Sequence, residues 1–228
     1  MSVLLYVFIV MDCIVFIHCC NLENRLGETI LLDQLKKLEQ YGLTTVIIGL
    51  VGLPLTTPDS RVIHFGLDTK VFEFPTLLLL QETAMLYPNS KILYIHTKGV
   101  SYDPSTTEYS TIKAWREFME YYCIVKSHEC ITLLNDYDTV GCLYTNKDTF
   151  EFPFYCGNFW WATASYINGL TRINDFVQTV KPNTPEPFLR HLAEFWLLHT
   201  KVAKCYSLFN NGLVSELYSQ RLCLPFHC

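Results

Sequence analysis

The chain lacks the features that usually mark nucleic-acid-binding proteins and disulfide-rich secreted proteins. Its 17 lysines and arginines are outnumbered by 22 acidic residues, which gives a formal net charge of −5. A nucleic-acid-binding face normally needs clustered basic residues, so no nucleic-acid partner is expected. No CxxC pair occurs among the ten cysteines, and most of them lie in apolar runs. Free cysteine behaves as a small hydrophobe in such runs, so we expect a reduced, intracellular, cytoplasmic protein.

The cysteine and histidine spacing gives little support for a metal site. A zinc site would have to combine Cys205, Cys223, His227 and Cys228. Their spacing fits no known zinc pattern well, so we expect no metal held by the protein's own side chains.

The first twenty residues are almost wholly apolar but lack a basic flank. No lysine or arginine precedes Arg25, whereas a signal or anchor segment usually carries one. Asp12 would lie near the middle of a membrane span, where it costs about 2.5–3.5 kcal/mol. The run is rich in Val and Ile, which favours a buried strand and no stable membrane span over an N-terminal anchor. Met11 is a second candidate start, which would make residues 1–10 a dispensable extension.

Apolar runs separated by turn residues predict alternating strands and helices along the rest of the chain. The predicted strands are residues 13–20, 44–51, 61–65, 92–96, 138–144 and 201–208, with a further apolar run at 155–162 that leads into a short helix. The predicted helices are residues 26–41, after the candidate caps Asn21 and Asn24, then 75–87, 111–134 and 187–199. Regular β-α-β alternation predicts an α/β fold, with a Rossmann-like, mostly parallel central sheet flanked by helices. No repeat, low-complexity tract or clear linker divides the chain, so we expect one domain over residues 1–228.

Polar residues follow directly after the predicted strand at 92–96. They are His96, Thr97, Lys98 and Gly99. Ligands of open α/β sheets bind at the carboxyl ends of the strands, and a lysine there suits an anionic group such as a phosphate. The alternative interpretation is a strand end that turns through Lys98 and Gly99 into a surface loop.

Two further segments carry side chains suited to catalysis or sugar binding. Glu194 lies in an apolar, aromatic setting and could act as a general base, or could simply pair with Arg190 one helical turn earlier. Glu186 and Asp148 are weaker candidates for the base. Residues 157–161 combine Gly157 and Asn158, which suit close approach and hydrogen bonding to hydroxyls, with a tryptophan pair. Adjacent strand residues point to opposite faces, so at most one of Trp160 and Trp161 is expected to meet a ligand.

Five segments in order resemble a family of GT-A-type glycosyltransferases found in bacteria and large DNA viruses. They are residues 72–77 (FEFPTL), 92–99 (ILYIHTKG), Trp115-Arg116 with Met119, 156–162 (CGNFWWA) and 190–197 (RHLAEFWL). The resemblance spans roughly residues 13–200. It implies a GT-A-like fold in which residues 11–110 bind a nucleotide sugar, expected to be UDP-linked, and residues 111–228 hold the acceptor and the catalytic group.

The resemblance also implies roles for particular residues. Glu194 would be the general base of an inverting transfer to a hydroxyl of a glycan or glycoprotein acceptor. The substrates would be bound by Cys20, Asn21, Glu73, His96, Thr97, Lys98, Gly99, Arg116, Gly157, Asn158, Trp160 and Trp161. Many such enzymes carry an Asp-x-Asp metal motif at the end of the strand that corresponds to residues 92–96, and here that strand end has no acidic residue. Lys98 would therefore offset the charge of the diphosphate, and Mg²⁺ or Mn²⁺ would bind only through the diphosphate itself.

Two alternatives to an active transferase remain. A catalytically silent nucleotide- or sugar-binding module of the same fold would keep Lys98 and the tryptophan pair, while Glu194 would be dispensable. A membrane-anchored structural protein, held by residues 2–20, is the weaker alternative. If the chain is viral, the expected location is the cytoplasm of the infected host cell.

Overall fold

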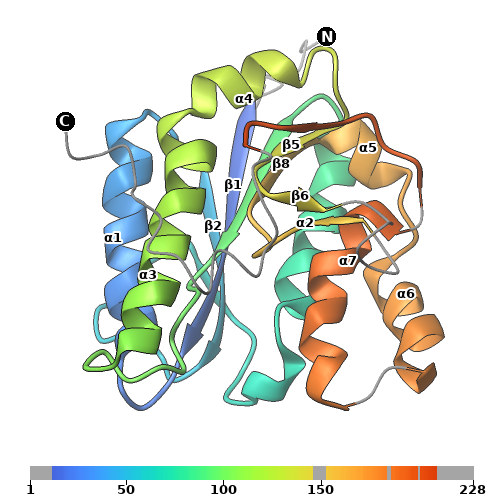
Figure 1. Ribbon diagram of the computed structural model, residues 1–228. Coiled ribbons are helices and arrows are strands. Elements are labelled where there is room, and N and C mark those ends of the chain that lie inside the picture. The colour runs from blue at the N-terminus through green and yellow to red at the C-terminus, as the bar shows by residue number, and fades with distance from the viewer. Residues whose placement is uncertain (1–11, 146–152, 184–185, 200, 210–228) are drawn as a thin grey trace, which may run out of the picture.

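The computed structural model describes residues 12–145, 153–183, 186–199 and 201–209, and its centre is a seven-stranded sheet (Figure 1). The strands of this sheet are β1 (Cys13–Asn21), β2 (Val46–Gly52), β3 (Val62–His64), β4 (Lys91–His96), β5 (Thr139–Gly141), β8 (Trp160–Thr163) and β9 (Cys205–Ser207). A separate antiparallel pair is formed by β6 (Tyr144–Thr145) and β7 (Phe154–Tyr155). The predicted α/β class is therefore confirmed.

The helices connect these strands. They are α1 (Leu26–Gln40), α2 (Phe74–Leu86), α3 (Thr107–Glu120), α4 (Ser127–Leu133), α5 (Ala164–Asn168), α6 (Ile173–Val180) and α7 (Leu192–His199). Short 3₁₀ segments are η1 (Thr69–Val71), η3 (Lys181–Asn183) and η4 (Glu186–His191), and a π-helical turn, η2 (Tyr121–Val125), follows α3.

The sheet is mostly parallel and runs in the order β3-β2-β1-β4-β8-β5-β9. Strands β1 to β4 pair in parallel, as do β5 and β9. Strand β8 is antiparallel to both of its neighbours, β4 and β5. The predicted parallel sheet with flanking helices is thus confirmed, with one antiparallel strand inserted between β4 and β5.

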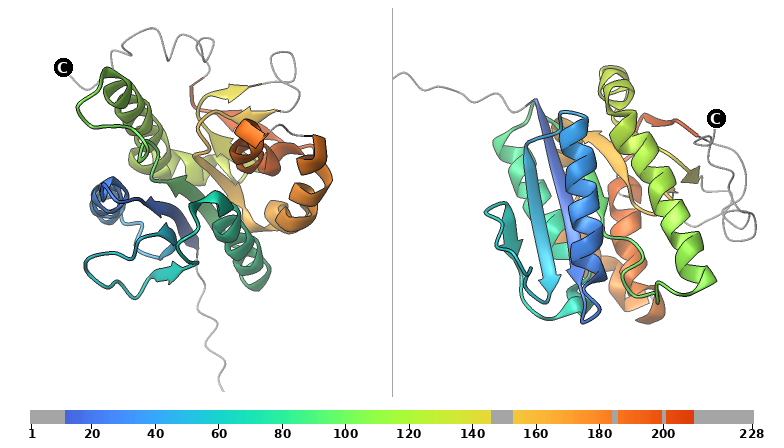
Figure 2. Two further views of the ribbon diagram at one scale, coloured as in Figure 1. Left: turned by 90° about the horizontal axis from the view of Figure 1, so that it is seen from below. Right: turned by 90° about the vertical axis from the view of Figure 1, so that its left-hand side faces the viewer.

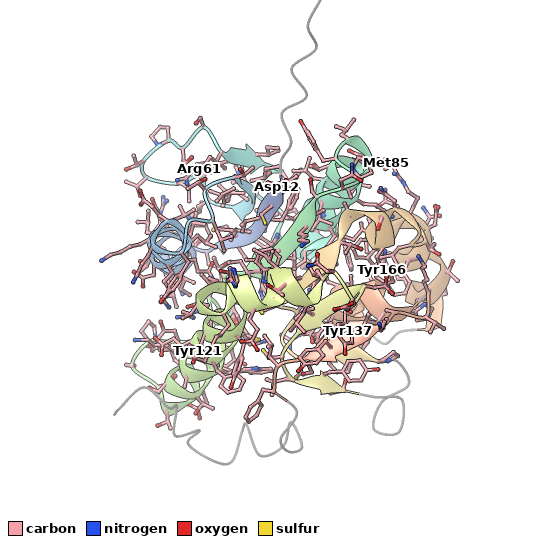
Figure 3. All side chains as sticks on the ribbon, turned by 90° about the horizontal axis from the view of Figure 1, so that it is seen from above. Asp12, Arg61, Met85, Tyr121, Tyr137 and Tyr166 are labelled. Atoms are coloured by element: carbon pink, nitrogen blue, oxygen red, sulfur yellow. The ribbon has the colours of Figure 1, made fainter. Side chains whose placement is uncertain are left out.

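Helices cover both faces of the sheet. In Figure 1, α1 and α3 lie on one side of the strands and α2, α6 and α7 on the other. Figure 3 shows the same division from above: Tyr121, at the end of α3, and Tyr166, on α5, lie on opposite sides of the sheet. Strand β1 is buried on both faces because alternate side chains enter two separate cores. Val15 and Ile17 pack with α1 and α3, while Ile14 and Phe16 pack with α2.

The start of α1 is fixed by two asparagines that the sequence identified as candidate caps. Asn24 Oδ1 accepts a hydrogen bond from the Leu26 backbone N–H at 3.0 Å, and Asn21 Oδ1 accepts from that of Glu28 at 3.3 Å. Each bond satisfies an amide that has no partner within the helix. The helix ends before Gly42, which adopts a φ of +74°.

Several predicted boundaries are wrong. The predicted helix at 111–134 begins earlier, at Thr107, where Thr106 Oγ1 caps it by accepting from the Tyr109 N–H. It is then interrupted by the π-helical turn η2 before α4 begins. The predicted strand at 138–144 is only Thr139–Gly141, and the predicted helix at 187–199 is a 3₁₀ segment followed by α7.

Some sequence-based candidates lie outside the described residues: positions 1–11, Asp148, Cys223, His227 and Cys228. No side-chain placement is described for Glu186 either. Across the ranges that the structure does describe, every helix is too short or too polar to cross a membrane.

Candidate functional site

The site lies where the order of the parallel strands reverses. The chain leaves β1 through α1, on one face of the sheet, to reach β2, and it reaches β4 through α2, on the other face. In open α/β sheets, ligands bind in the crevice that forms at such a reversal, outside the carboxyl ends of the strands. A cavity of about 360 Å³ lies there, lined by residues from the ends of β1 and β4. The left view of Figure 2, from below, looks onto this edge of the sheet.

The cavity brings together seven of the thirteen residues that the sequence and the resemblance selected. They are Cys20, Glu73, His96, Thr97, Lys98, Gly99 and Glu194. These residues come from β1, from the end of β4 and the turn that follows it, from the segment before α2 and from helix α7. The sheet therefore gathers positions that are up to 174 residues apart in the sequence (194 minus 20) at one edge.

Lys98 is held against an aromatic ring at the edge of the cavity. Its Nζ lies 4.0 Å from the ring centroid of Trp115, which is a cation–π contact. The Lys98 carbonyl accepts a hydrogen bond from Arg116 Nη1 at 2.6 Å. Gly99 follows with a φ of +102°, and a Cβ there would lie 3.1 Å from the Ile112 side chain. The main chain and the side chain of Lys98 are thus both oriented by α3.

Two neutral histidines form part of the cavity wall. His18 and His96 are direct neighbours in the register of β1 and β4. Burial, which disfavours the charged ring, lowers the pKa of each to about 4, and the nearby Lys98 contributes to the shift of His96. His18 Nδ1 lies 2.9 Å from Thr76 Oγ1. At neutral pH the positive charge at this end of the cavity therefore comes from Lys98.

Gly157 links His96 to Glu194 through its peptide groups. His96 Nε2 donates to the Gly157 carbonyl at 2.9 Å, and the Gly157 N–H donates to Glu194 Oε2 at 3.3 Å. Gly157 has a φ of +89°, and a Cβ at this position would lie 2.4 Å from Met119 Sδ. Any larger residue would have to displace the Met119 side chain, so the close packing of α3 against this backbone explains why position 157 is a glycine.

Glu73 is fixed by two donors. Its Oε2 accepts from the Tyr94 hydroxyl at 2.6 Å and from Asn158 Nδ2 at 2.7 Å. Asn158 Oδ1 in turn accepts from Trp160 Nε1 at 2.8 Å. Burial and the Glu73 carboxylate raise the pKa of Tyr94, which keeps its hydroxyl protonated as a donor. Glu73 therefore presents a carboxylate of fixed orientation to the cavity.

Six selected residues do not line the cavity. They are Asn21, Arg116, Gly157, Asn158, Trp160 and Trp161. Trp160 stacks on Tyr94 in one core, and Trp161 donates from Nε1 to the Cys123 carbonyl in the other. The adjacent rings do point to opposite faces, but both are buried, so we remove both tryptophans from the ligand-contacting set. Arg116, Gly157 and Asn158 support neighbouring groups through the contacts given above. Asn21 hydrogen-bonds to the start of α1 and to the Leu53 carbonyl.

Several residues that line the cavity were not selected from the sequence. The main ones are His18, Phe72, Tyr102, Phe154, Arg190 and His191. Phe72 has a φ of +50°, an uncommon conformation for a bulky residue and one that tends to occur at functional sites. His18 could have been selected only as the cross-strand neighbour of His96, and that requires knowing that β1 pairs with β4. Arg190 was considered only as a partner of Glu194, whereas its Nε donates to His191 Nε2 at 3.1 Å.

The cavity thus combines two cations, two carboxylates and several aromatic walls. Lys98 and Arg190 can bind an anionic group, while Glu73 and Glu194 can accept hydrogen bonds from hydroxyls. Phe72, Tyr102 and Trp115 offer apolar surface to a flat or weakly polar group. In the parts of the chain that are described, no three His, Cys, Asp or Glu side chains cluster in a way that suits a metal ion.

Fold and cavity together define an α/β protein with a candidate ligand site at the switch point of a mostly parallel sheet. Residues 17–207 match the model of a protein family described as a domain of unknown function (DUF8361), and the chain belongs to that family. No curated protein and no solved structure matches the chain at a significant level.

Proposed function

We propose that this protein is a GT-A-like glycosyltransferase that moves a sugar from a nucleotide diphosphate sugar, UDP-linked in the first instance, to a hydroxyl of a glycan or glycoprotein. The observation that carries the proposal is the shared cavity of Lys98 and Glu194 at the switch point of the sheet. An anion-binding cation in the turn after β4 and a carboxylate on α7 lie around a space of about 360 Å³. This arrangement suits a substrate that carries both a diphosphate and a reacting sugar carbon.

In the proposed reaction, Glu194 accepts the proton of the acceptor hydroxyl as its oxygen attacks the anomeric carbon. A new carbon–oxygen bond forms while the bond from that carbon to the diphosphate oxygen breaks. The electron pair leaves with the nucleoside diphosphate, whose added negative charge is stabilised by Lys98 and Arg190. A single displacement of this kind inverts the configuration at the anomeric carbon.

The surrounding contacts favour these roles. The Gly157 N–H fixes one oxygen of Glu194, which orients the carboxylate. Trp115 holds the Lys98 ammonium in place, which reduces the entropy lost when it binds an anion. Glu73, held by Tyr94 and Asn158, would accept hydrogen bonds from hydroxyls of the sugar or the ribose.

Calorimetric titration of the purified protein with UDP tests binding, and release of UDP from a panel of UDP-sugars tests turnover. Both assays are run with EDTA and with Mn²⁺. We expect UDP to bind with EDTA present, because Lys98 and Arg190 supply positive charge, and we expect slow UDP release from at least one donor. Binding without turnover, even with candidate acceptors, would favour the silent binding module. If neither UDP nor another nucleoside diphosphate binds under either condition, the transferase proposal fails.

A further inference from the structure

A buried carboxylate lies behind the site, outside the cavity. Glu120, at the end of α3, is 2% exposed. Its Oε1 accepts a hydrogen bond from Gln34 Nε2 at 3.0 Å and lies 3.6 Å from Arg116 Nε, and its Oε2 pairs with Lys37. A buried carboxylate is retained only where such partners compensate its lost hydration. Glu120 thus joins α1, which carries Gln34 and Lys37, to α3.

Two of these partners reach the main chain at the end of β4. Gln34 Nε2 also donates to the His96 carbonyl at 3.1 Å, and Arg116 Nη1 donates to the Lys98 carbonyl at 2.6 Å. These two carbonyls flank Thr97, whose side chain accepts from the Cys20 N–H on β1. The segment that carries three of the cavity-lining side chains is therefore held from behind by two polar side chains, and both are oriented by one carboxylate.

We propose that Glu120 is a positioning residue of the site, which acts through Gln34 and Arg116 on the backbone of residues 96–98. Arg116, which the sequence presented as a ligand contact, works from behind the strand instead. Its guanidinium contacts Glu120 and a backbone carbonyl and is absent from the cavity lining. The position of residues 96–98 can be tested in the free protein. The effect of Glu120 on UDP binding, in contrast, rests on the proposed function.

The chain offers a matched pair of variants for the test. Gln34→Met removes the bonds to both Glu120 and the His96 carbonyl while keeping an unbranched side chain of similar length. Lys37→Met removes another partner of Glu120 on the same helix, but Lys37 has no hydrogen bond to the strand end among the described contacts. If the cluster only stabilised the fold, each variant would change amide exchange and UDP affinity in proportion to the stability that it loses, and the two variants would not differ in kind.

The first readout is hydrogen–deuterium exchange of the free protein. The amides of Thr97, Lys98 and Tyr102 are bonded to backbone carbonyls within or beside the segment, so their protection reports its order. Gln34→Met should speed exchange in a peptide that covers residues 97–102 by about tenfold or more, while Lys37→Met leaves it within about twofold. Equal exchange in wild type and Gln34→Met overturns the inference, whether or not UDP binds.

The second readout is UDP affinity together with a double-mutant cycle. Gln34→Met should weaken UDP binding by about tenfold, because a displacement near 1 Å costs this much or more at a preorganised site. Combining it with Lys98→Met should cost less than the sum of the single effects, since both act on the same contact. Full additivity, or an equal loss of affinity in Lys37→Met, refutes a role through Lys98. If wild type binds no nucleoside diphosphate, the proposed function fails, while the exchange result still decides the positioning role.

Discussion

Lys98, two residues after the end of β4, and Trp115 on α3 are joined by a cation–π contact, with Lys98 Nζ 4.0 Å from the centroid of the indole ring. The contact spans the gap between the end of a central strand and the helix that covers one face of the sheet. It keeps the ammonium beside the cavity. A cation held in this way remains able to bind an incoming anion.

Lys98→Met should weaken UDP binding by at least about tenfold, because a hydrogen bond to a charged group contributes about 1.5–3 kcal/mol. The loss should shrink as salt is raised, since part of the attraction is screened. Calorimetric titration at low and high salt measures both effects. The matched control is Lys113→Met on α3, because the Lys113 side chain is 51% exposed and pairs with Glu117. This variant should leave the affinity unchanged. Equal affinities for wild type and Lys98→Met would remove Lys98 from the diphosphate site.

Glu194→Gln should lower turnover by about 10²–10⁴-fold while UDP affinity stays within about threefold. The amide cannot take the acceptor's proton, but its oxygen can still accept from the Gly157 N–H, so the local structure is retained. Rates of UDP release, measured beside calorimetric affinities, separate the two quantities. Glu117→Gln, with a 39% exposed carboxylate on α3, is the control and should behave as wild type. Substantial turnover by Glu194→Gln would show that another group acts as the base.

The central part of the fold could be predicted from the sequence because its signals are local. The unbroken apolar run of β1 indicates a strand buried on both faces, and Asn24 and Gly42 mark the two ends of α1. The weaker predictions fell on residues 107–134. Apolar residues recur every three or four positions from Trp115 to Val125, straight through the π-helical turn, so the pattern could not reveal the interruption before α4.

The candidate site was only partly predictable, for a related reason. Lys98 and Glu194 could be selected because their residue types and neighbours stand out. His18 could not, because its role depends on the pairing of β1 with β4, which places it level with His96. Conversely, Trp160 and Trp161 stand out in the sequence, but only their cross-strand and helix contacts show that both rings are buried. Residue type is visible in a sequence, whereas the direction of a side chain depends on long-range packing.

The buried histidines should make folding stability depend on pH below neutrality. Burial lowers the folded-state pKa of His18 to about 4, while the unfolded value is the ordinary 6.5. The unfolded state therefore binds more protons between these values, and stability is lost as the pH falls from about 6.5 towards 4. Between pH 7 and pH 4.5 the loss due to His18 should be on the order of 2 kcal/mol.

Urea unfolding of wild type and His18→Gln at pH 7 and pH 4.5 measures this contribution. The variant should lose about 2 kcal/mol less than wild type over the interval, since glutamine does not titrate. His128→Gln, which alters an exposed histidine, should lose as much as wild type. Parallel losses in wild type and His18→Gln would contradict a depressed pKa for His18.

Gly157→Ala and Gly42→Ala compare two glycines of positive φ that differ in their surroundings. Gly157 has a φ of +89° and Gly42 a φ of +74°, so each alanine should carry backbone strain of about 1–2 kcal/mol. A Cβ at Gly42 meets nothing within 4 Å, whereas one at Gly157 would lie 2.4 Å from the Sδ of the fully buried Met119. Overpacking should therefore add about 1–3 kcal/mol at Gly157 alone, measured by urea unfolding.

The added cost at Gly157 can be traced to its cause with a second substitution. Met119→Ala by itself should destabilise the protein through the cavity that it leaves, but it also makes room for the new methyl group. The double variant should then be more stable than the sum of the single effects predicts, by about 1 kcal/mol or more. The same second substitution should bring no such relief to Gly42→Ala, because Gly42 does not contact Met119. Strict additivity at Gly157 would show that the strain lies in the backbone, and that the peptide joining His96 to Glu194 is not confined by the packing of α3.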